Sequence, residues 1–516
     1  MAKGNSVNLD AMIKREDLIA KTENLTSYEN VPTISVRDFG KDGFIGKSLR
    51  KPDFQRETNH WTPDQVASLL ECFVNGDLIP SVILWQSESY LFVIDGGHRL
   101  SVIKAWLEDD YGDGPTSSAF FGGDIPKQQK ESAKKTRKLV NDRVGSFQHI
   151  KAKIDADIID SRTIAVTSRG IPIQWVKGNV DKAESSFFKI NTKGTPLDKI
   201  EESLLRFRKY PIPISARAVI RSGFGHKYWS EFDENIRAQI ESVAHSLSQT
   251  LFEPELDSPI KTLDLPLGGA RGVRDALQIL IDFFSVSAEV TSPKPLGVSF
   301  SGEDKDGTAT LSVLKKGLKL AKRITGSDAG SLGLHPAIYF YGPTGGHSLP
   351  MFLGTARAIS RKISDNHPTF FKDFTFARSG IEKILIEHKE LIATILQKLS
   401  SKKRVIAYEA LFTKIFENFK NGIDISEESL VEWGGVSGKV LIGSATKDVT
   451  DFSDEEKSKA FVQMAINSAV KCPICNGYLD SKSMSYDHIA RVREGGKGDS
   501  SNCQITHPFC NHGIKN

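Results

Sequence analysis

The chain ends in CPICNGYLDSKSMSYDHIARVREGGKGDSSNCQITHPFCNHGIKN, residues 472–516, and this tail holds four of the five cysteines of the protein. Cys472 and Cys475 form a C-x-x-C pair. His507 and Cys510 form an H-x-x-C pair, with 31 residues between Cys475 and His507. Three thiolates and one imidazole are a complete tetrahedral ligand set for Zn²⁺. Because a segment of about 50 residues buries too little apolar surface to fold alone, the spacing predicts a small domain stapled by a structural zinc ion.

The loop between the two pairs carries a second group of polar residues. Asp487 and His488 lie on an expected strand. Asn502 precedes a second expected strand, and Asn511 begins an expected short helix. Carboxylate and carboxamide oxygens suit Mg²⁺ or Mn²⁺, and a neutral imidazole beside them can take a proton from water. Since a closed zinc site has no open coordination position, we expect a second, catalytic ion at this loop.

In order and spacing, the D-H, G-G, N and C-N-x-x-x-K elements between the two pairs resemble an HNH endonuclease of the ββα-metal fold. The resemblance covers residues 472–516. It implies that His488 activates the attacking water, with Asn502 orienting its ring. It also implies that Asp487 and Asn511 hold the divalent ion. Expected phosphate contacts are Lys515, Arg491 and Arg493. The alternative is a zinc knuckle that binds nucleic acid without cutting it.

A second stretch, LFVIDGGHRLSVIKAW at residues 91–106, reads as a strand, a Gly-Gly turn and a helix. Gly96 and Gly97 let the backbone approach a ligand closely. The first amides of the helix, together with Arg99, suit an anionic group such as phosphate. A tight structural turn explains the same residues equally well.

Together with PDFQRETNH at residues 52–60 and FFKINTKGTPLDKIEESLLR at residues 187–206, this stretch resembles the N-terminal domain of GmrSD-type restriction proteins. That domain has a ParB/sulfiredoxin-like α/β fold, and relatives bind or hydrolyse nucleoside triphosphates there. The residues implied for a nucleotide or phosphate site are Arg56, Asp95, Gly96, Gly97, His98, Arg99, Asn191 and Lys193. Gly97 and His98 replace two glutamines of the family pattern, and Lys189 replaces an arginine, which leaves nucleotide hydrolysis open.

The remaining patterns divide the chain. KQQKESAKKTRK at residues 127–138 has six basic residues in twelve, and a solvated basic helix is favoured over a nucleic-acid stripe. SRTIAVTS at residues 161–168 is expected to be a strand. His335 and His347 read as packing histidines more readily than as a metal pair.

The expected fold class is an α+β multidomain protein. Its expected domains are a ParB-like domain at 31–215, a mainly helical domain at 216–420, a linker at 421–452 and an HNH domain at 453–516.

Composition sets few further limits. The 516 residues carry a formal net charge of +4, which permits a polyanionic partner without requiring one. No apolar run approaches the roughly 18 residues that cross a bilayer, and the N-terminus lacks a secretory signal, so no membrane partner is expected. With no disulfide framework, a cytoplasmic location is expected.

The combined expectation is a metal-dependent DNA endonuclease of a restriction or anti-phage system. Its N-terminal domain would sense a nucleotide or modified phage DNA and control cleavage. The expected cofactors are catalytic Mg²⁺ or Mn²⁺, structural Zn²⁺ and a nucleoside triphosphate. One catalytic set per chain would need two protomers, and hence a homo-oligomer, for a cut in both strands. Two alternatives are a nucleotide-dependent DNA-binding protein and a toxin-like or homing-type nuclease.

Overall fold

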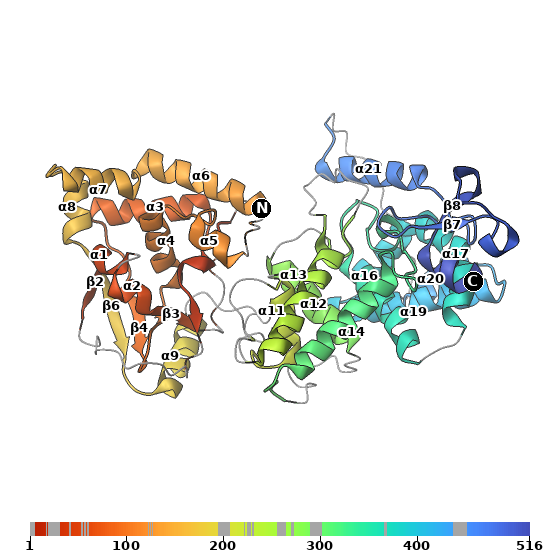
Figure 1. Cartoon of the computed structure of the whole chain (residues 1–516), viewed down its shortest axis with the longest axis horizontal. Coiled ribbons are helices and arrows are strands. Elements are labelled where there is room, and N and C mark those ends of the chain that lie inside the picture. Colours follow the sequence, from red (N-terminus) through yellow and green to blue (C-terminus); the bar gives the residue numbers. More distant parts are fainter. Residues whose placement is uncertain are drawn as a thin grey trace. The chain divides into compact units, whose positions relative to one another are not determined.

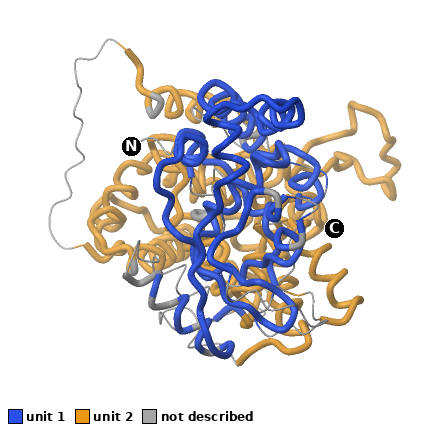
Figure 2. The backbone as a smooth tube through the Cα atoms, turned by 90° about the vertical axis from the view of Figure 1, so that its left-hand side faces the viewer, with its two compact units in different colours: residues 1–208, 224–228 blue, residues 209–223, 229–516 orange. Residues whose placement is uncertain are grey.

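The computed structural model describes residues 6–16, 18, 31–40, 43–52, 55, 58, 61–121, 123, 125, 127–193, 207–220, 222–223, 229, 232–254, 265–269, 273–288, 302–365, 369–436 and 451–515. The chain divides into two compact units (Figure 2). Unit 1 comprises Met1–Arg208 and Phe224–Tyr228, and unit 2 comprises Lys209–Gly223 and Trp229–Asn516. Helices and strands both contribute, so the fold is mixed α/β (Figure 1). The expected four-part division and the ParB-like topology stay predictions.

Unit 1 is built on a mixed sheet whose described strands follow the order β1-β3-β5-β4-β6-β2. Neighbours β1–β3, β3–β5 and β4–β6 are parallel, whereas β4–β5 and β2–β6 are antiparallel. The strands are β1 (Arg15–Glu16), β2 (Thr33–Ser35), β3 (Leu49–Pro52), β4 (Val82–Gln86), β5 (Leu91–Asp95) and β6 (Gly170–Val176). The strand predicted before the Gly-Gly turn is β5.

Strand β5 is apolar from Leu91 to Ile94 because helices cover both faces of the sheet. Leu91 and Val93 belong to the larger core, which α3 (Pro63–Asn75) and α4 (Gly97–Glu108) complete. Phe92 and Ile94 point to the other face, against α9 (Val180–Lys193). The other helices of unit 1 are η1 (Asp10–Met12), α1 (Val36–Phe39), α2 (Phe44–Ser48), α5 (Pro115–Phe120), α6 (Lys127–Arg143), α7 (Phe147–Asp155) and α8 (Ser161–Ser168). In Figure 1, α6, α7 and α8 lie along α3.

The predicted strand at SRTIAVTS is wrong, because this segment is helix α8. The Asp160 carboxylate accepts hydrogen bonds from the backbone N–H groups of Arg162 (3.0 Å) and Thr163 (2.8 Å). In return, the Thr163 hydroxyl oxygen accepts the N–H of Asp160 at 2.8 Å. This capping box starts a helix in spite of the β-branched residues that favour a strand.

Unit 2 is mainly helical, as predicted for its central part. Its helices are α11 (Pro211–Ile220), α12 (Glu234–Phe252), α13 (Val273–Ser287), α14 (Thr308–Ile324), α15 (Pro336–Tyr339), α16 (Leu349–Ser364), α17 (Phe370–Glu387), α18 (Lys389–Lys398), α19 (Ser401–Lys420), α20 (Glu427–Trp433) and α21 (Asp454–Ser468). Among the described residues, no helix is both long and apolar enough to cross a membrane.

The tail adds a small hairpin to unit 2. Strand β7 (Ser485–His488) pairs antiparallel with β8 (Cys503–Thr506). Single turns η2 (Val492–Glu494) and η3 (Ser500–Asn502) lie between the strands, and the short helix η4 (Cys510–Lys515) follows. The tail packs on the helices, since the Phe509 ring meets Phe371 of α17 edge to face with centroids 6.1 Å apart.

Candidate functional site

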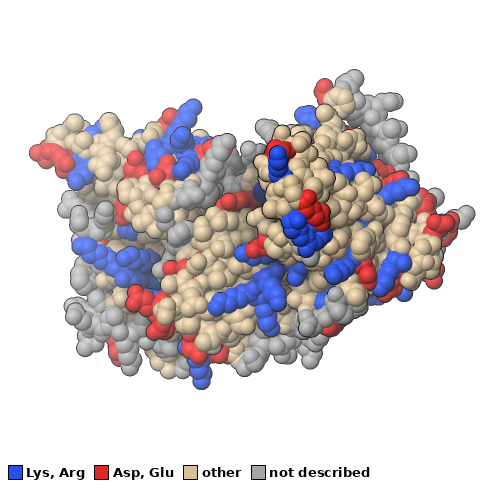
Figure 3. Space-filling view, turned by 45° about the vertical axis from the view of Figure 1, so that its right-hand side comes forward, with Lys and Arg blue, Asp and Glu red and all other residues tan. Residues whose placement is uncertain are grey.

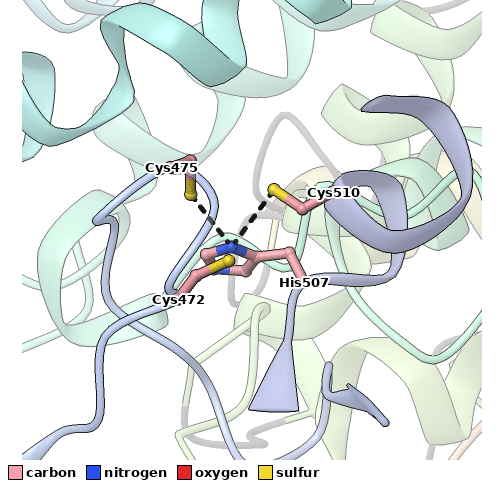
Figure 4. A group of neighbouring side chains, drawn as sticks. All are labelled: Cys472, Cys475, His507 and Cys510. Carbon is pink, nitrogen blue, oxygen red and sulfur yellow. Dashed lines mark hydrogen bonds between the residues drawn. The ribbon is translucent and has the colours of Figure 1, made fainter. Parts of the chain in front are cut away.

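The four predicted zinc ligands converge at the base of the hairpin (Figure 4). The ligand atoms of Cys472, Cys475, His507 and Cys510, called here the zinc clasp, all lie within 4.8 Å of one another, and all four residues are buried. The His507 Nδ1 atom is 3.3 Å from the Cys475 sulfur and 3.8 Å from the Cys510 sulfur. Because Zn–S bonds are about 2.3 Å long, a tetrahedral zinc site places its sulfurs about 3.8 Å apart. The clasp therefore fits a structural metal such as zinc.

Short-range backbone bonds shape the first half of the clasp. The N–H of Asn476 donates to the Cys472 carbonyl, and the N–H of Cys472 donates to the Gly477 carbonyl, both at 2.8 Å. Asn476 takes a φ of 55°, a left-handed conformation that asparagine tolerates better than most residues. The N–H of Gly477 points at the Cys475 sulfur, 3.4 Å away. Such an amide stabilises a thiolate, as metal binding requires.

The second half of the clasp depends on the tautomer of His507. Its Nε2 lies 2.9 Å from the Tyr478 carbonyl oxygen, which only accepts, so Nε2 carries the hydrogen. The Nδ1 lone pair is then directed at the sulfurs. A backbone carbonyl that fixes the tautomer of a histidine ligand is a common outer contact of metal sites.

The ionisation of the three thiols also points to a cation. Hydrogen bonds from Cys475 and Cys510 lower the pKa of Cys472. The bond to Cys472 raises the pKa of Cys475 to about 11 and also raises that of Cys510. Without a cation, the Cys472 thiolate therefore accepts hydrogen bonds from the thiols of Cys475 and Cys510, which stay protonated. A bound cation would allow all three to ionise together.

An ion pair on α17 connects the clasp to the helical part of unit 2. This pair was not among the expected site residues. Glu382 accepts the N–H of Tyr478 at 2.7 Å and pairs with Arg378 at 2.7 Å. Arg378 also donates to the Tyr478 carbonyl at 3.4 Å. The exposed fractions of the two side chains are 2% and 0%. In the sequence, an Arg–Glu pair four residues apart looks like an ordinary surface pair, so the pattern held no signal of this contact.

Asp487, the expected ligand of the catalytic ion, is buried on β7. Its Oδ2 atom accepts hydrogen bonds from Gln504 at 2.7 Å and from the Lys515 ammonium at 2.8 Å. Gln504 lies directly opposite Asp487 in the β7–β8 register. The sequence analysis did not single out Gln504, although hairpin pairing would have placed it there. Lys515, expected to contact phosphate, is held on the carboxylate instead.

Asn511, the second expected ligand, lies in η4 and packs against the strand that carries Asp487. Its Nδ2 atom donates to the Ser485 hydroxyl at 2.9 Å and to the Tyr486 carbonyl at 3.2 Å. These bonds fix the carboxamide, whose oxygen is the kind of donor that a hard cation binds. Asp487 and Asn511 are thus brought together at β7.

His488, the expected base, has an exposed side chain at the end of β7. Asn502 was expected to orient the His488 ring, but its side-chain bonds go elsewhere. Its oxygen accepts the N–H of Ala490 at 2.7 Å, and its Nδ2 donates to the carbonyls of Ala490 (3.1 Å) and Lys497 (2.8 Å). The Asn502 carbonyl accepts the N–H of Ile489 at 2.8 Å. Asn502 therefore holds the loop that follows His488, because the hairpin places it just beyond the last strand pair.

The two expected arginine contacts differ. Arg491 donates to the Lys515 carbonyl and so links the loop to η4. Arg493 is largely exposed, at 71%, with Glu494 4.0 Å away. Arg493 is therefore the one of these two whose charge faces solvent.

The other expected site lies at the β5–α4 turn of unit 1. Gly96 has a φ of 93°, and a Cβ atom there would come within 2.6 Å of Val82, so glycine is required. Gly97 begins α4. Arg99 pairs with Asp95 at 2.8 Å and donates to the Ser81 carbonyl at 3.2 Å. The structure thus brings Asp95, Gly96, Gly97 and Arg99 together at one turn.

Two aromatic or polar groups stand beside this turn. The His98 ring stacks on Trp61 with centroids 5.6 Å apart. The nearly buried Gln55 lies over Gly97, and its Oε1 atom has no hydrogen-bond partner in the described part of the chain. Gln55 directly precedes Arg56 in the stretch PDFQRETNH, but only the arginine was among the expected site residues. Arg56 and the side chains of Asn191 and Lys193 lie outside the described residues, although the backbone of the latter two ends α9.

A known protein family matches most of unit 1. Residues 36–207 match the family model described as GmrSD restriction endonuclease, N-terminal domain. The chain therefore contains a GmrSD-type N-terminal domain, as the resemblance predicted. The match does not extend to the tail. No curated protein and no solved structure matches the chain.

Proposed function

We propose that this protein is a metal-dependent endonuclease that hydrolyses DNA, with the tail as its catalytic part. The GmrSD-type domain at residues 36–207 suggests a restriction or defence nuclease, for which DNA is the partner. The single observation that carries the catalytic assignment is that Asn511 of η4 is hydrogen-bonded to the strand β7 that carries Asp487, directly beside a buried three-cysteine, one-histidine clasp. The zinc clasp would stabilise the fold of the tail, and the hairpin would carry the active site.

Asp487 and Asn511 fit a hard cation because one offers a carboxylate and the other a carboxamide oxygen. A Mg²⁺ or Mn²⁺ ion held there would stabilise the charge that develops on the phosphate and on the leaving 3′-oxygen. The Lys515 ammonium lies on the Asp487 carboxylate, so the ion would have to displace it. Lys515 would turn to a phosphate once another cation neutralises Asp487.

His488 would take the proton of the attacking water as the water oxygen bonds to phosphorus. Its exposure at the strand end suits a base that must reach a bulky substrate. Asn502 would position His488 indirectly, by fixing Ile489 and Ala490 immediately after it. A positioning role of this kind predicts a milder loss for Asn502→Ala than for His488→Ala.

We further propose that the β5–α4 turn binds a nucleotide or an element of modified phage DNA and thereby controls cleavage. The support is the cluster of Asp95, Gly96 and Arg99 at a helix start, with Gln55 over Gly97. An anion at the turn would compete with Asp95 for Arg99, and this exchange would be the switch. Equal cutting rates with and without nucleotide, on modified and unmodified DNA, would contradict this control.

The second candidate function is a DNA-binding protein whose tail binds DNA without cutting it. It is favoured by the Lys515–Asp487 pair, because a neutralised carboxylate binds cations less readily.

An infection assay with expressing and non-expressing cells separates a defence role from that of a toxin-like or homing-type nuclease.

The decisive experiment compares plasmid cleavage by wild type, His488→Ala and His512→Ala in Mg²⁺ or Mn²⁺. His512 is an exposed histidine of η4 and serves as the matched control. The nuclease proposal expects cutting to fall by about 10²–10⁴-fold in His488→Ala alone, as is typical for loss of a general base. Zinc content should be the same in all three proteins. Unchanged cutting in His488→Ala, or no cutting by wild type, would favour the binding protein.

A further inference from the structure

Helix α14 of unit 2 carries a concentrated positive charge that the proposed chemistry does not use. Five of its residues between 315 and 323 are Lys or Arg, and none from Thr308 to Ile324 is acidic. Its buried side, which includes Leu314 and Leu320, packs into the unit. The opposite side exposes Lys315, Lys316, Lys319 and Lys322, called here the lysine face.

The lysine face is only weakly neutralised. Lys315 donates to the neutral amide of Gln239 at 3.3 Å, and Lys322 pairs with Asp328 at 3.3 Å. In the described part of the chain, Lys316 and Lys319 have no ion pair. Four like charges on two turns repel one another, which an anionic partner would relieve.

Helix α6 provides a comparison within the same chain. Lys134, Lys135 and Lys138 have the same spacing as Lys315, Lys316 and Lys319, and they are equally exposed. However, α6 also contains acidic residues, and its Arg137 is tied to Asp109 and Asp113. Mixed charge of this kind is typical of a solvated helix, as predicted for α6. The unmixed charge of α14 is not explained in that way.

The shape of α14 also suits an extended polyanion. A shallow, open depression of about 380 Å³ lies on one side of the helix, lined by Thr308, Leu311, Ser312, Lys315, Lys316 and Lys319. From Lys315 to Lys322 the helix rises about 10 Å, which is about three times the axial rise per nucleotide of one DNA strand. Figure 3 shows that the basic side chains on one face of the molecule gather in separate patches rather than in a continuous layer. Binding would therefore be local to such a patch.

The end of α14 is joined directly to the start of the candidate nuclease site. Ser483 exchanges a 2.8 Å hydrogen bond with Thr325, immediately after the helix, and accepts the N–H of Gly326 at 2.7 Å. Ser483 is two residues before β7, which carries Asp487 and His488. The lysine face and the hairpin therefore belong to the same compact unit, and these hydrogen bonds link the end of α14 to the segment before β7.

We propose that the lysine face of α14 binds the phosphate backbone of duplex DNA and guides it to the tail. This surface rests on the proposed function for its partner, but it makes a separate prediction about binding. Contacts to phosphate carry no sequence information, so the surface would set affinity and register while specificity lies elsewhere.

The test measures how the affinity for a fluorescent DNA duplex depends on salt, using the full chain with His488→Ala so that no cutting occurs. The variants are Lys315→Gln/Lys316→Gln/Lys319→Gln and the matched control Lys134→Gln/Lys135→Gln/Lys138→Gln. Each phosphate contact contributes about 0.9 to the slope of log affinity against log salt, so the α14 variant should lose up to about 2.7 from the slope. The control should keep the slope of its parent. All substitutions are on exposed side chains, and thermal melting would verify folding.

Equal slopes in the two triple variants would overturn the proposal. An equal loss of affinity for an RNA duplex or for vesicles containing phosphatidylserine, with no preference for DNA, would also overturn its choice of partner. Plasmid cleavage by the same triple variants, made in the chain that keeps His488, separates the α14 proposal from the proposed nuclease activity. If wild type cuts and the slopes are equal, only the α14 surface is wrong. If wild type does not cut and the α14 slope falls, the surface stands without the nuclease.

Discussion

Replacing Glu382 by glutamine tests whether the helical part of unit 2 holds the zinc clasp together. Glu382 is fully buried, neutralises Arg378 and accepts both the Tyr339 hydroxyl at 3.0 Å and the N–H of Tyr478 at 2.7 Å. Glutamine has nearly the same shape but leaves Arg378 charged and unpaired in the interior. Breaking a buried pair in this way costs about 3–5 kcal/mol.

The cost should appear as earlier release of zinc. With a denaturant dependence of about 1–3 kcal/mol per molar urea, the midpoint of zinc release should fall by at least about 1 M. The released ion can be followed with a chromogenic chelator in a urea titration of the full chain. Because Tyr478 also bonds to His507, the loosened knuckle should release zinc before the helices of unit 2 unfold.

Glu409→Gln is the matched control for this variant. Glu409 is also buried in unit 2 and pairs with Arg357 at 2.6 Å and Arg361 at 2.8 Å, on helices α16 and α19. Its loss should weaken the helices without a direct effect on the clasp. The reasoning would be refuted if zinc left Glu382→Gln and Glu409→Gln at the same urea concentration.

Two further predictions concern thiols and pH. Cys503 is exposed whereas the clasp cysteines are buried, so a thiol reagent should modify Cys503 readily, and zinc chelation should expose three more thiols. A count unaffected by chelation would contradict the clasp. Burial lowers the pKa of His347 to about 4, so the native state keeps it neutral while the unfolded chain takes up a proton below pH 6.5. Stability is therefore lost as the pH falls from about 6.5 to 4, by about 2 kcal/mol at pH 5 for this residue. Between pH 7 and pH 5, the unfolding free energy of His347→Gln in urea should therefore fall by about 2 kcal/mol less than that of wild type. An equal fall would argue against a neutral, half-buried His347.

Local pattern was enough for the parts of the protein whose structure depends on near neighbours in the sequence. The C-x-x-C and H-x-x-C spacing identified the four residues that meet in the clasp, because each pair is brought together by a single turn. The apolar runs before and after the Gly-Gly turn likewise marked β5 and α4.

Tertiary structure decided what depends on residues far apart in the chain. The Arg378–Glu382 pair reaches the clasp from about a hundred residues away, and its burial cannot be read from a helical repeat. Asn502 bonds to the loop and not to His488, because the hairpin register sets which atoms it can reach. The sequence determined which residues gather around the expected ions through short-range spacing. Only the fold determined what surrounds and orients them, since hydrogen-bond partners and desolvation are properties of the packed chain.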